Sequence, residues 1–135
     1  MPLYTDPTRT DFADTEAMAQ CSSVPELLAS IPGRLESVRF LRLAAGSVIH
    51  EHRDPGLSVE EGAFRLHIPV RTNPEVEFLV GGQSMQMAEG ECWYVNFDLP
   101  HSLVNRGTND RVHLVVDGLV DDAVLDWFGL APARA

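Results

Sequence analysis

The feature that most constrains the fold is a succession of eight short β-type segments between residues 38 and 119. Most of the segments are rich in Val, Ile, Leu or Phe, and turn-forming residues such as Gly, Pro and Asn separate each from the next. The predicted strands cover residues 38–43, 47–52, 64–70, 76–80, 84–87, 92–97, 101–105 and 111–119. Many short strands with regular turns are typical of an all-β sandwich or barrel, and eight fit a jelly roll, that is, a double-stranded β-helix. We therefore expect an all-β protein with minor α structure and a β core at about 38–119.

Two short helices are expected to flank the strands. The first follows Ser23, whose hydroxyl can cap it, carries Pro25 in its first turn and ends before Gly33. The second covers about residues 120–130, with acidic residues at its positive end, and we expect it to cover the barrel. Residues 1–15 show no periodicity and predict an extended or partly ordered arm. With 135 residues, the chain has the length of a single domain.

The composition argues against several classes of function. Twenty acidic residues oppose ten basic ones, and the formal net charge of -10 disfavours a nucleic-acid partner. All ten basic residues are arginine, so Schiff-base chemistry on lysine is excluded. No apolar run approaches the roughly 20 residues of a membrane-spanning helix and no secretion signal is evident, so we expect a cytoplasmic protein without a membrane partner. The cysteines, Cys21 and Cys92, fit neither a disulfide framework nor a zinc site, and we expect both to be reduced and buried.

Histidine and aspartate residues form a candidate metal site. His50, His52 and Asp54 alternate along the chain, so in an extended segment their side chains leave the same face. His101 opens a later strand. Two imidazoles and one carboxylate match the facial arrangement that binds Fe(II) and leaves three coordination positions open. The role of His50 stays open, and a solvated turn around Asp54 is the simpler alternative.

Arginines on the predicted strands form a candidate anion site. Arg65 and His67 share one face of their strand, and Arg111 opens the last strand. A guanidinium inside a small barrel needs a partner, and its planar fork suits a carboxylate. Two separate cationic points suit a dicarboxylate. The alternative is that these arginines pair with structural acids such as Asp117 or Glu77.

Several of these motifs occur together in one order. They lie at residues 38–43, 52–54, 65–70 with 72–73, 90–93, 101 with 105, and 111–117. In this order they resemble the aspartyl/asparaginyl β-hydroxylase family of Fe(II)- and 2-oxoglutarate-dependent oxygenases, which also includes free-proline hydroxylases. The resemblance covers the chain from about Val38 to Asp117.

The resemblance implies a role for each candidate residue. Iron would be bound by His52, Asp54 and His101. Arg65 and His67 would face the 1-carboxylate of the cosubstrate 2-oxoglutarate, and Arg111 would clamp its 5-carboxylate. The implied reaction uses O2, converts 2-oxoglutarate to succinate and CO2, and hydroxylates an amino acid, free or in a peptide.

Two other classes of function remain open at this point. A metal-binding cupin that is not an oxygenase would use His50 and a glutamate at the metal, and would act as an isomerase, a dioxygenase without cosubstrate or a small-ligand sensor. It would have no need for Arg65, His67 and Arg111. A barrel that binds a partner without metal is the other class. Edge strands and terminal helices of such a domain also offer surfaces for a homodimer.

Overall fold

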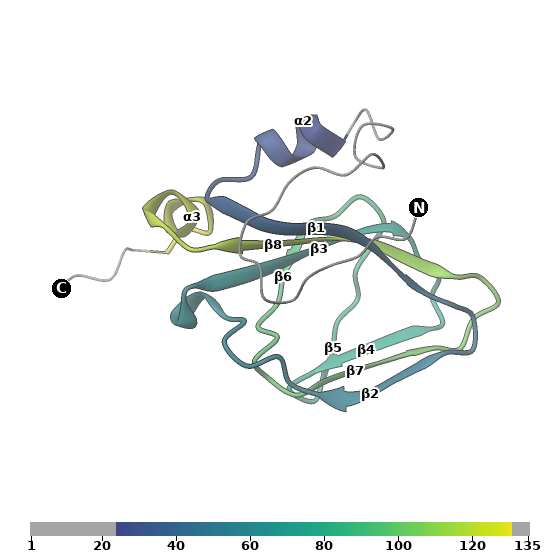
Figure 1. Cartoon of the computed structure of the whole chain (residues 1–135). Coiled ribbons are helices and arrows are strands. Elements are labelled where there is room, and N and C mark those ends of the chain that lie inside the picture. Colours follow the sequence, from purple (N-terminus) through teal and green to yellow (C-terminus); the bar gives the residue numbers. More distant parts are fainter. Residues whose placement is uncertain (1–23, 131–135) are drawn as a thin grey trace, which may run out of the picture.

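The computed structural model describes residues 24–130 of the chain (Figure 1). Its elements follow in the order α2 (Val24–Ala29), β1 (Arg34–Leu43), β2 (Val48–His52), the 3-10 helix η1 (Val59–Glu61), β3 (Ala63–Arg71), β4 (Val76–Val80), β5 (Gln83–Ser84), β6 (Trp93–Tyr94), β7 (His101–Asn105), β8 (Arg111–Leu119) and α3 (Asp122–Trp127). The predicted arm at residues 1–15 and Cys21 lie outside the described residues.

The strands form two four-stranded antiparallel sheets. The first sheet has the order β1-β8-β3-β6, and the second has the order β2-β7-β4-β5. The sheets face each other as the two layers of a sandwich (Figure 1). Apart from β4 and β5, which pair in the second sheet, strands that follow each other in the chain belong to different layers. The predicted mostly β jelly roll with two short helices is confirmed.

The predicted strand bounds agree best where both neighbours of a strand are in place. The bounds of β4, β7 and β8 coincide with the predicted ones. By contrast, β5 and β6 are shorter than the predicted strands 84–87 and 92–97. Side chains beyond β6 still point inward, because Val95 and Phe97 belong to the core although their backbone leaves the ladder. Alternation in the sequence therefore predicts which side chains are buried, but it does not predict which backbone residues pair with a neighbouring strand.

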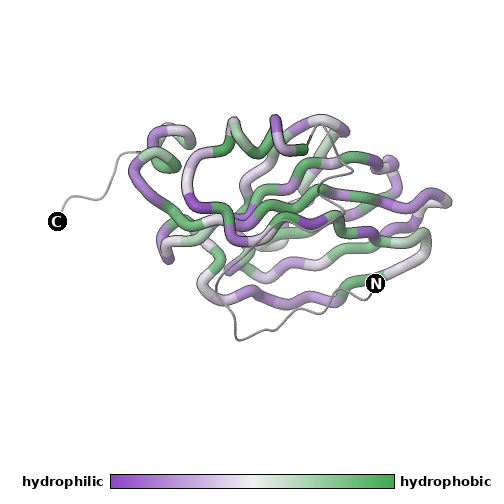
Figure 2. The backbone as a smooth tube through the Cα atoms, turned by 45° about the horizontal axis from the view of Figure 1, so that its top comes forward, coloured by the Kyte–Doolittle hydropathy of each residue, from purple (hydrophilic) through white to green (hydrophobic). Residues whose placement is uncertain are grey.

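Two hydrophobic clusters hold the layers together. The outer core lies on the face of the first sheet that α2 and α3 cover (Figure 1), and its buried members are Val24, Ile31, Phe64, Leu66, Leu114, Val116 and Val124. The inner core draws on both sheets, and its buried members are Leu43, Phe78, Val80, Val95, Phe97 and Leu103. Hydrophobic and hydrophilic residues alternate along the strands (Figure 2), so β3 and β8 serve the outer core with one set of side chains and leave the other set for the interior.

The helix α3 is seated by local interactions. Asp121 caps it, because the Asp121 side chain accepts a hydrogen bond from the Val124 backbone N–H at 2.9 Å. The Phe128 ring packs edge-on against Phe64, with 5.9 Å between centroids, whereas Trp127 remains 45% exposed. The expected covering role therefore holds for Phe128. No helix within residues 24–130 has the length and apolar character needed to span a membrane.

The prediction that Cys92 is buried is wrong. Its side chain is exposed, one residue before β6. The strand β6 is only two residues long and lies at the edge of the first sheet. An edge position has a neighbouring strand on one side only, so a residue just outside it gains little cover.

Candidate active site

The pairing of β2 with β7 brings two histidines together. His52 is the last residue of β2, His101 is the first residue of β7, and the two are register partners. Their rings make an edge contact with 4.3 Å between centroids. Asp54 follows two residues after β2, and its backbone N–H donates to the Phe97 carbonyl at 2.9 Å. The backbone of two separate segments thus places all three candidate ligands.

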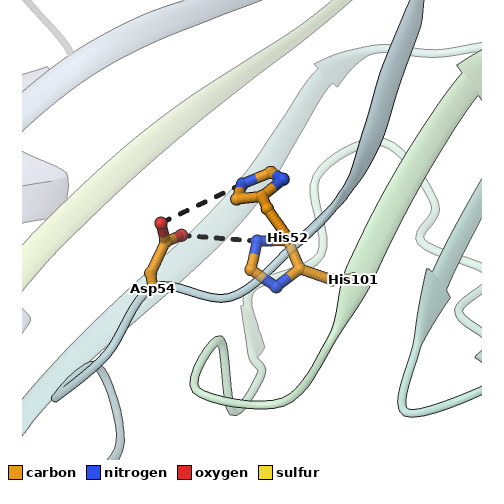
Figure 3. A group of neighbouring side chains, drawn as sticks. All are labelled: His52, Asp54 and His101. Carbon is orange, nitrogen blue, oxygen red and sulfur yellow. Dashed lines mark ion pairs between the residues drawn. The ribbon is translucent and has the colours of Figure 1, made fainter.

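The three side chains converge on one point (Figure 3). One ligand atom from each of His52, Asp54 and His101 lies within 4.8 Å of the other two. Nε2 of His52 is 3.9 Å from Oδ1 of Asp54, and Nε2 of His101 is 3.3 Å from Oδ2. His101 is only 3% exposed, whereas His52 and Asp54 are partly open to solvent. The site therefore has a closed side and an accessible side.

Backbone carbonyls determine which ring nitrogen of each histidine carries the proton. Nδ1 of His52 lies 2.8 Å from the His50 carbonyl, and Nδ1 of His101 lies 2.9 Å from the Leu99 carbonyl. A carbonyl oxygen can only accept, so in both rings Nδ1–H is the donor. Nε2 of each ring is therefore the nitrogen that faces Asp54. Metal-binding histidines in proteins are held in this way, so the three residues fit a divalent metal ion.

His50 does not join this group. The β2 and β7 ladder shifts register between Ile49 and His52, which breaks the alternation that the sequence suggests. Within residues 24–130, the metal-capable group comprises His52, Asp54 and His101, without His50 and without a glutamate. His50 contributes to the site through its backbone carbonyl, which accepts the hydrogen bond from His52. This geometry matches the two-histidine, one-carboxylate arrangement and lacks the set that the cupin alternative requires.

Arg65 lies beside the candidate metal ligands and is already paired. Its Nε and Nη2 donate to the two carboxylate oxygens of Asp117 at 2.7 and 2.9 Å. Its Nη1 lies 3.3 Å from Oδ2 of Asp54. The pairing of this arginine with Asp117, one of the two alternatives from the sequence, is what the structure shows. One edge of the guanidinium remains directed at the metal site.

Two buried imidazoles, those of His67 and His113, lie in the interior beyond the candidate metal ligands. Nδ1 of His67 lies 2.8 Å from Nδ1 of His113, and both rings are buried. Burial, and then the nearby His113 and Arg111, lowers the pKa of His67 to about 2. Burial, and then Arg111, lowers the pKa of His113 to about 3. Both rings are therefore neutral at pH 7.

Arg111 is a buried cation that no carboxylate balances within the described residues. It is 3% exposed, and its Nε donates to Nε2 of His113 at 3.1 Å. No salt bridge shorter than 4.0 Å joins it to an acid within residues 24–130. Burial lowers the pKa of Arg111 to about 10, which still leaves it protonated at pH 7. A buried charge without a partner is costly, so this position favours an anionic ligand.

A small hollow opens beside Arg111. It is lined also by Thr72, Asn73, Gln86 and His113. Its volume is about 30 Å³, which is room for about two water-sized groups. The end of a carboxylate, with two oxygens, is of this size.

Aromatic rings connect the two ends of the interior. The Phe97 ring lies 4.9 Å from the His101 ring and 5.0 Å from the His67 ring, measured between centroids. His67 in turn contacts His113, which contacts Arg111. The metal-capable group and the buried arginine are thus two ends of one row of side chains. His113 was not singled out from the sequence, although its place two residues after Arg111 on the same strand face was a usable signal.

Solved structures of other proteins have a fold similar to that of this chain. A predicted oxalate decarboxylase from Thermotoga maritima superimposes with a TM-score of 0.50 and 20% sequence identity, over 70% of this chain and 73% of that one. A cupin 2 conserved barrel domain protein from Salinispora arenicola gives a TM-score of 0.48 and 18% identity, over 74% of each chain. At these identities the likeness concerns the fold alone.

The family follows from the sequence match. Residues 8–120 match the model of the family described as Aspartyl/Asparaginyl beta-hydroxylase, and the chain belongs to this family. The chain is also 30% identical over 79 residues to the L-proline cis-4-hydroxylase of Rhizobium meliloti (strain 1021). That match spans 58% of this chain and 28% of the length of the relative. The resemblance seen in the sequence motifs is confirmed.

Proposed function

We propose that this chain is an Fe(II)- and 2-oxoglutarate-dependent dioxygenase that hydroxylates an amino acid, free or within a peptide. The observation that carries the proposal is the pair of sites in one interior: a group of His52, Asp54 and His101 at one end, and the unbalanced cation of Arg111 at the other. Family membership and the 30% identity to a proline hydroxylase support the hydroxylase class.

The donor set favours iron as the metal. Two imidazole nitrogens and one carboxylate leave three positions open on an octahedral ion, as non-haem Fe(II) oxygenases require. His52 and His101 would each bind through Nε2, and their Nδ1–H bonds to backbone carbonyls would hold the rings in place. Iron bound there would supply oxidation of a C–H bond by O2, coupled to the conversion of 2-oxoglutarate to succinate and CO2.

Arg111 would hold the 5-carboxylate of 2-oxoglutarate. Its burial removes competing water, and a charge-assisted bidentate contact is stronger in such a place than at the surface. The neutral rings of His67 and His113 add donors and acceptors along the interior without adding charge. His67 and Arg65 would face the 1-carboxylate, with Arg65 contributing the Nη1 side of its guanidinium because Asp117 accepts from Nε and Nη2.

The names of the relatives support an amino-acid substrate. The family description names aspartyl and asparaginyl residues, and the printed name of one relative is that of an L-proline hydroxylase. Both are amino acids, in a chain or free, and either would reach the metal from the side where His52 and Asp54 are open. Free L-proline and an aspartate-containing peptide are the first substrates to try.

The proposal is tested by an anaerobic titration. Fe(II) and then 2-oxoglutarate are added to metal-free protein, and the visible metal-to-ligand charge-transfer band of the chelated cosubstrate is recorded. We expect the band to appear, and to require at least about tenfold more 2-oxoglutarate in Arg111→Met, since a charge-assisted contact contributes about 1.5–3 kcal/mol. The matched control is Arg106→Met, which removes an exposed arginine paired with Glu77. Tight metal binding without a band would contradict the proposal.

A further inference from the structure

Two arginines on the inner side of the first sheet share the carboxylate of Asp117. It accepts two hydrogen bonds from Arg65, at 2.7 and 2.9 Å, and one from Arg39 at 3.2 Å. Arg39 also donates to the Ser37 hydroxyl. All of these contacts lie on the inner side of β1, β3 and β8, where Asp117 is the register partner of both Ser37 and Arg65. Asp117 therefore sits at the centre of a network that the three strands build together.

Arg65 faces a second carboxylate, that of Asp54. Its Nη1 is 3.3 Å from Oδ2 of Asp54, and the same oxygen is 3.3 Å from Nε2 of His101. Arg65 thus has two possible carboxylate partners. The edge of its guanidinium that carries Nε and Nη2 can form a two-bond pair with only one of them. In the structure Asp117 takes the two-bond pairing and Asp54 receives a single long contact.

We propose that Asp117 is a positioning residue for the metal centre: it engages Arg65 so that the carboxylate of Asp54 stays available to the metal. The inference rests on the proposed metal site and concerns its outer partners. Without the charge of Asp117, Arg65 would have Asp54 as its nearest carboxylate and would pair with it. A carboxylate neutralised by an arginine fork is a poor metal ligand, so metal affinity would fall.

The test measures metal affinity and needs no substrate. Co(II) binding to the metal-free protein is followed by competition with a chromophoric chelator, for the wild type and for Asp117→Asn. We expect the variant to bind Co(II) about 10- to 100-fold more weakly, the range usual for partners of metal ligands. The matched control is Glu77→Gln, an acid removed from the surface pair with Arg106, which leaves the affinity unchanged.

A double substitution shows whether Asp117 acts through Arg65. In Arg65→Gln no guanidinium competes for Asp54, so adding Asp117→Asn changes the affinity by less than about threefold. If Asp117→Asn costs the same factor with and without Arg65, the inference is overturned and only a general effect of charge or structure is left. If Asp117→Asn alone leaves the affinity unchanged, it is overturned as well. Failure of the wild type to bind Co(II) would instead contradict the proposed metal site, and the inference with it.

A measurement on the wild type covers the case in which Asp117→Asn does not fold. The Nε–H resonance of Arg65 is assigned by its loss in Arg65→Gln. It is then followed by NMR while Zn(II) is added. We expect the hydrogen-bonded resonance to persist in the metal-loaded protein, because Nε donates to Asp117 and not to Asp54. A resonance that loses its protection on metal binding would show that the Arg65 and Asp117 pair breaks, and would overturn the inference.

Discussion

The Nε–H of Arg111 donates to Nε2 of His113 at 3.1 Å, so a buried cation rests on a neutral imidazole. The imidazole accepts a hydrogen bond from the guanidinium, but being neutral it does not balance the positive charge of Arg111. The charge is then available to a carboxylate from outside the described residues, which is the basis of the proposed cosubstrate site. His113 also contacts His67, so Arg111, His113 and His67 form one chain of contacts.

The buried histidines should make the protein less stable in mild acid. The pKa values of His67 and His113, about 2 and about 3, lie below the ordinary 6.5, so the unfolded chain takes up protons first as the pH falls. Stability is therefore lost from about pH 6.5 downward, by roughly 2 kcal/mol per histidine between pH 7 and pH 5. Urea unfolding at both pH values measures this loss. His113→Gln should lose about half as much, and an equal loss in both proteins would contradict the assignment.

The metal site predicts opposite outcomes for two nearby substitutions. Asp54→Ala removes one of the three proposed ligands. We therefore expect the Co(II) affinity to fall further than it does when an outer partner of a metal ligand is lost, which costs about 10- to 100-fold. His50→Ala keeps the backbone carbonyl that His52 uses, so we expect the affinity to stay within about threefold of the wild type. Chelator competition measures both. Loss of metal in His50→Ala with binding retained in Asp54→Ala would favour the cupin alternative.

Gly118 should not tolerate a side chain. A Cβ at this position would lie 2.5 Å from the Phe64 ring and 3.1 Å from the Arg34 carbonyl. We expect Gly118→Ala to lower the free energy of unfolding by about 1–3 kcal/mol, as overpacking of a core does. Urea denaturation measures this change. Combining it with Phe64→Leu should give less than the sum of the two single effects, and strict additivity would show that the ring is not the obstacle.

The cap of α3 should be visible in stability. Asp121→Ala removes the acceptor of the Val124 N–H bond, and we expect a loss of about 1 kcal/mol in the free energy of unfolding. Asp122→Ala is the control, because Asp122 lies in the first turn and no capping bond of its side chain is seen among the described residues. Thermal or urea unfolding of the two variants should therefore differ. Equal losses would mean that the charge near the helix start matters more than the bond.

The sequence predicted the strands because their side chains alternate and their turns carry Gly, Pro and Asn. It predicted α3 from the acids at its start, and the structure shows that one of them, Asp121, caps the helix. The prediction that Cys92 is buried was wrong, since cover at a sheet edge depends on which strands lie next to each other. The pairing order of the strands joins residues as far apart as Arg39 and Asp117, and no local pattern encodes it.

The sequence by itself determined the fold class, the family and the identity of the candidate ligands, because these depend on residue types at given spacings. Only the tertiary structure decided how those residues are used. It placed a register shift that leaves His50 outside the metal group, paired Arg65 with Asp117, and left Arg111 without a carboxylate among the described residues. The physical reason is that each of these outcomes depends on a partner from a distant strand, and the distance between charges in a folded interior decides which pairs form.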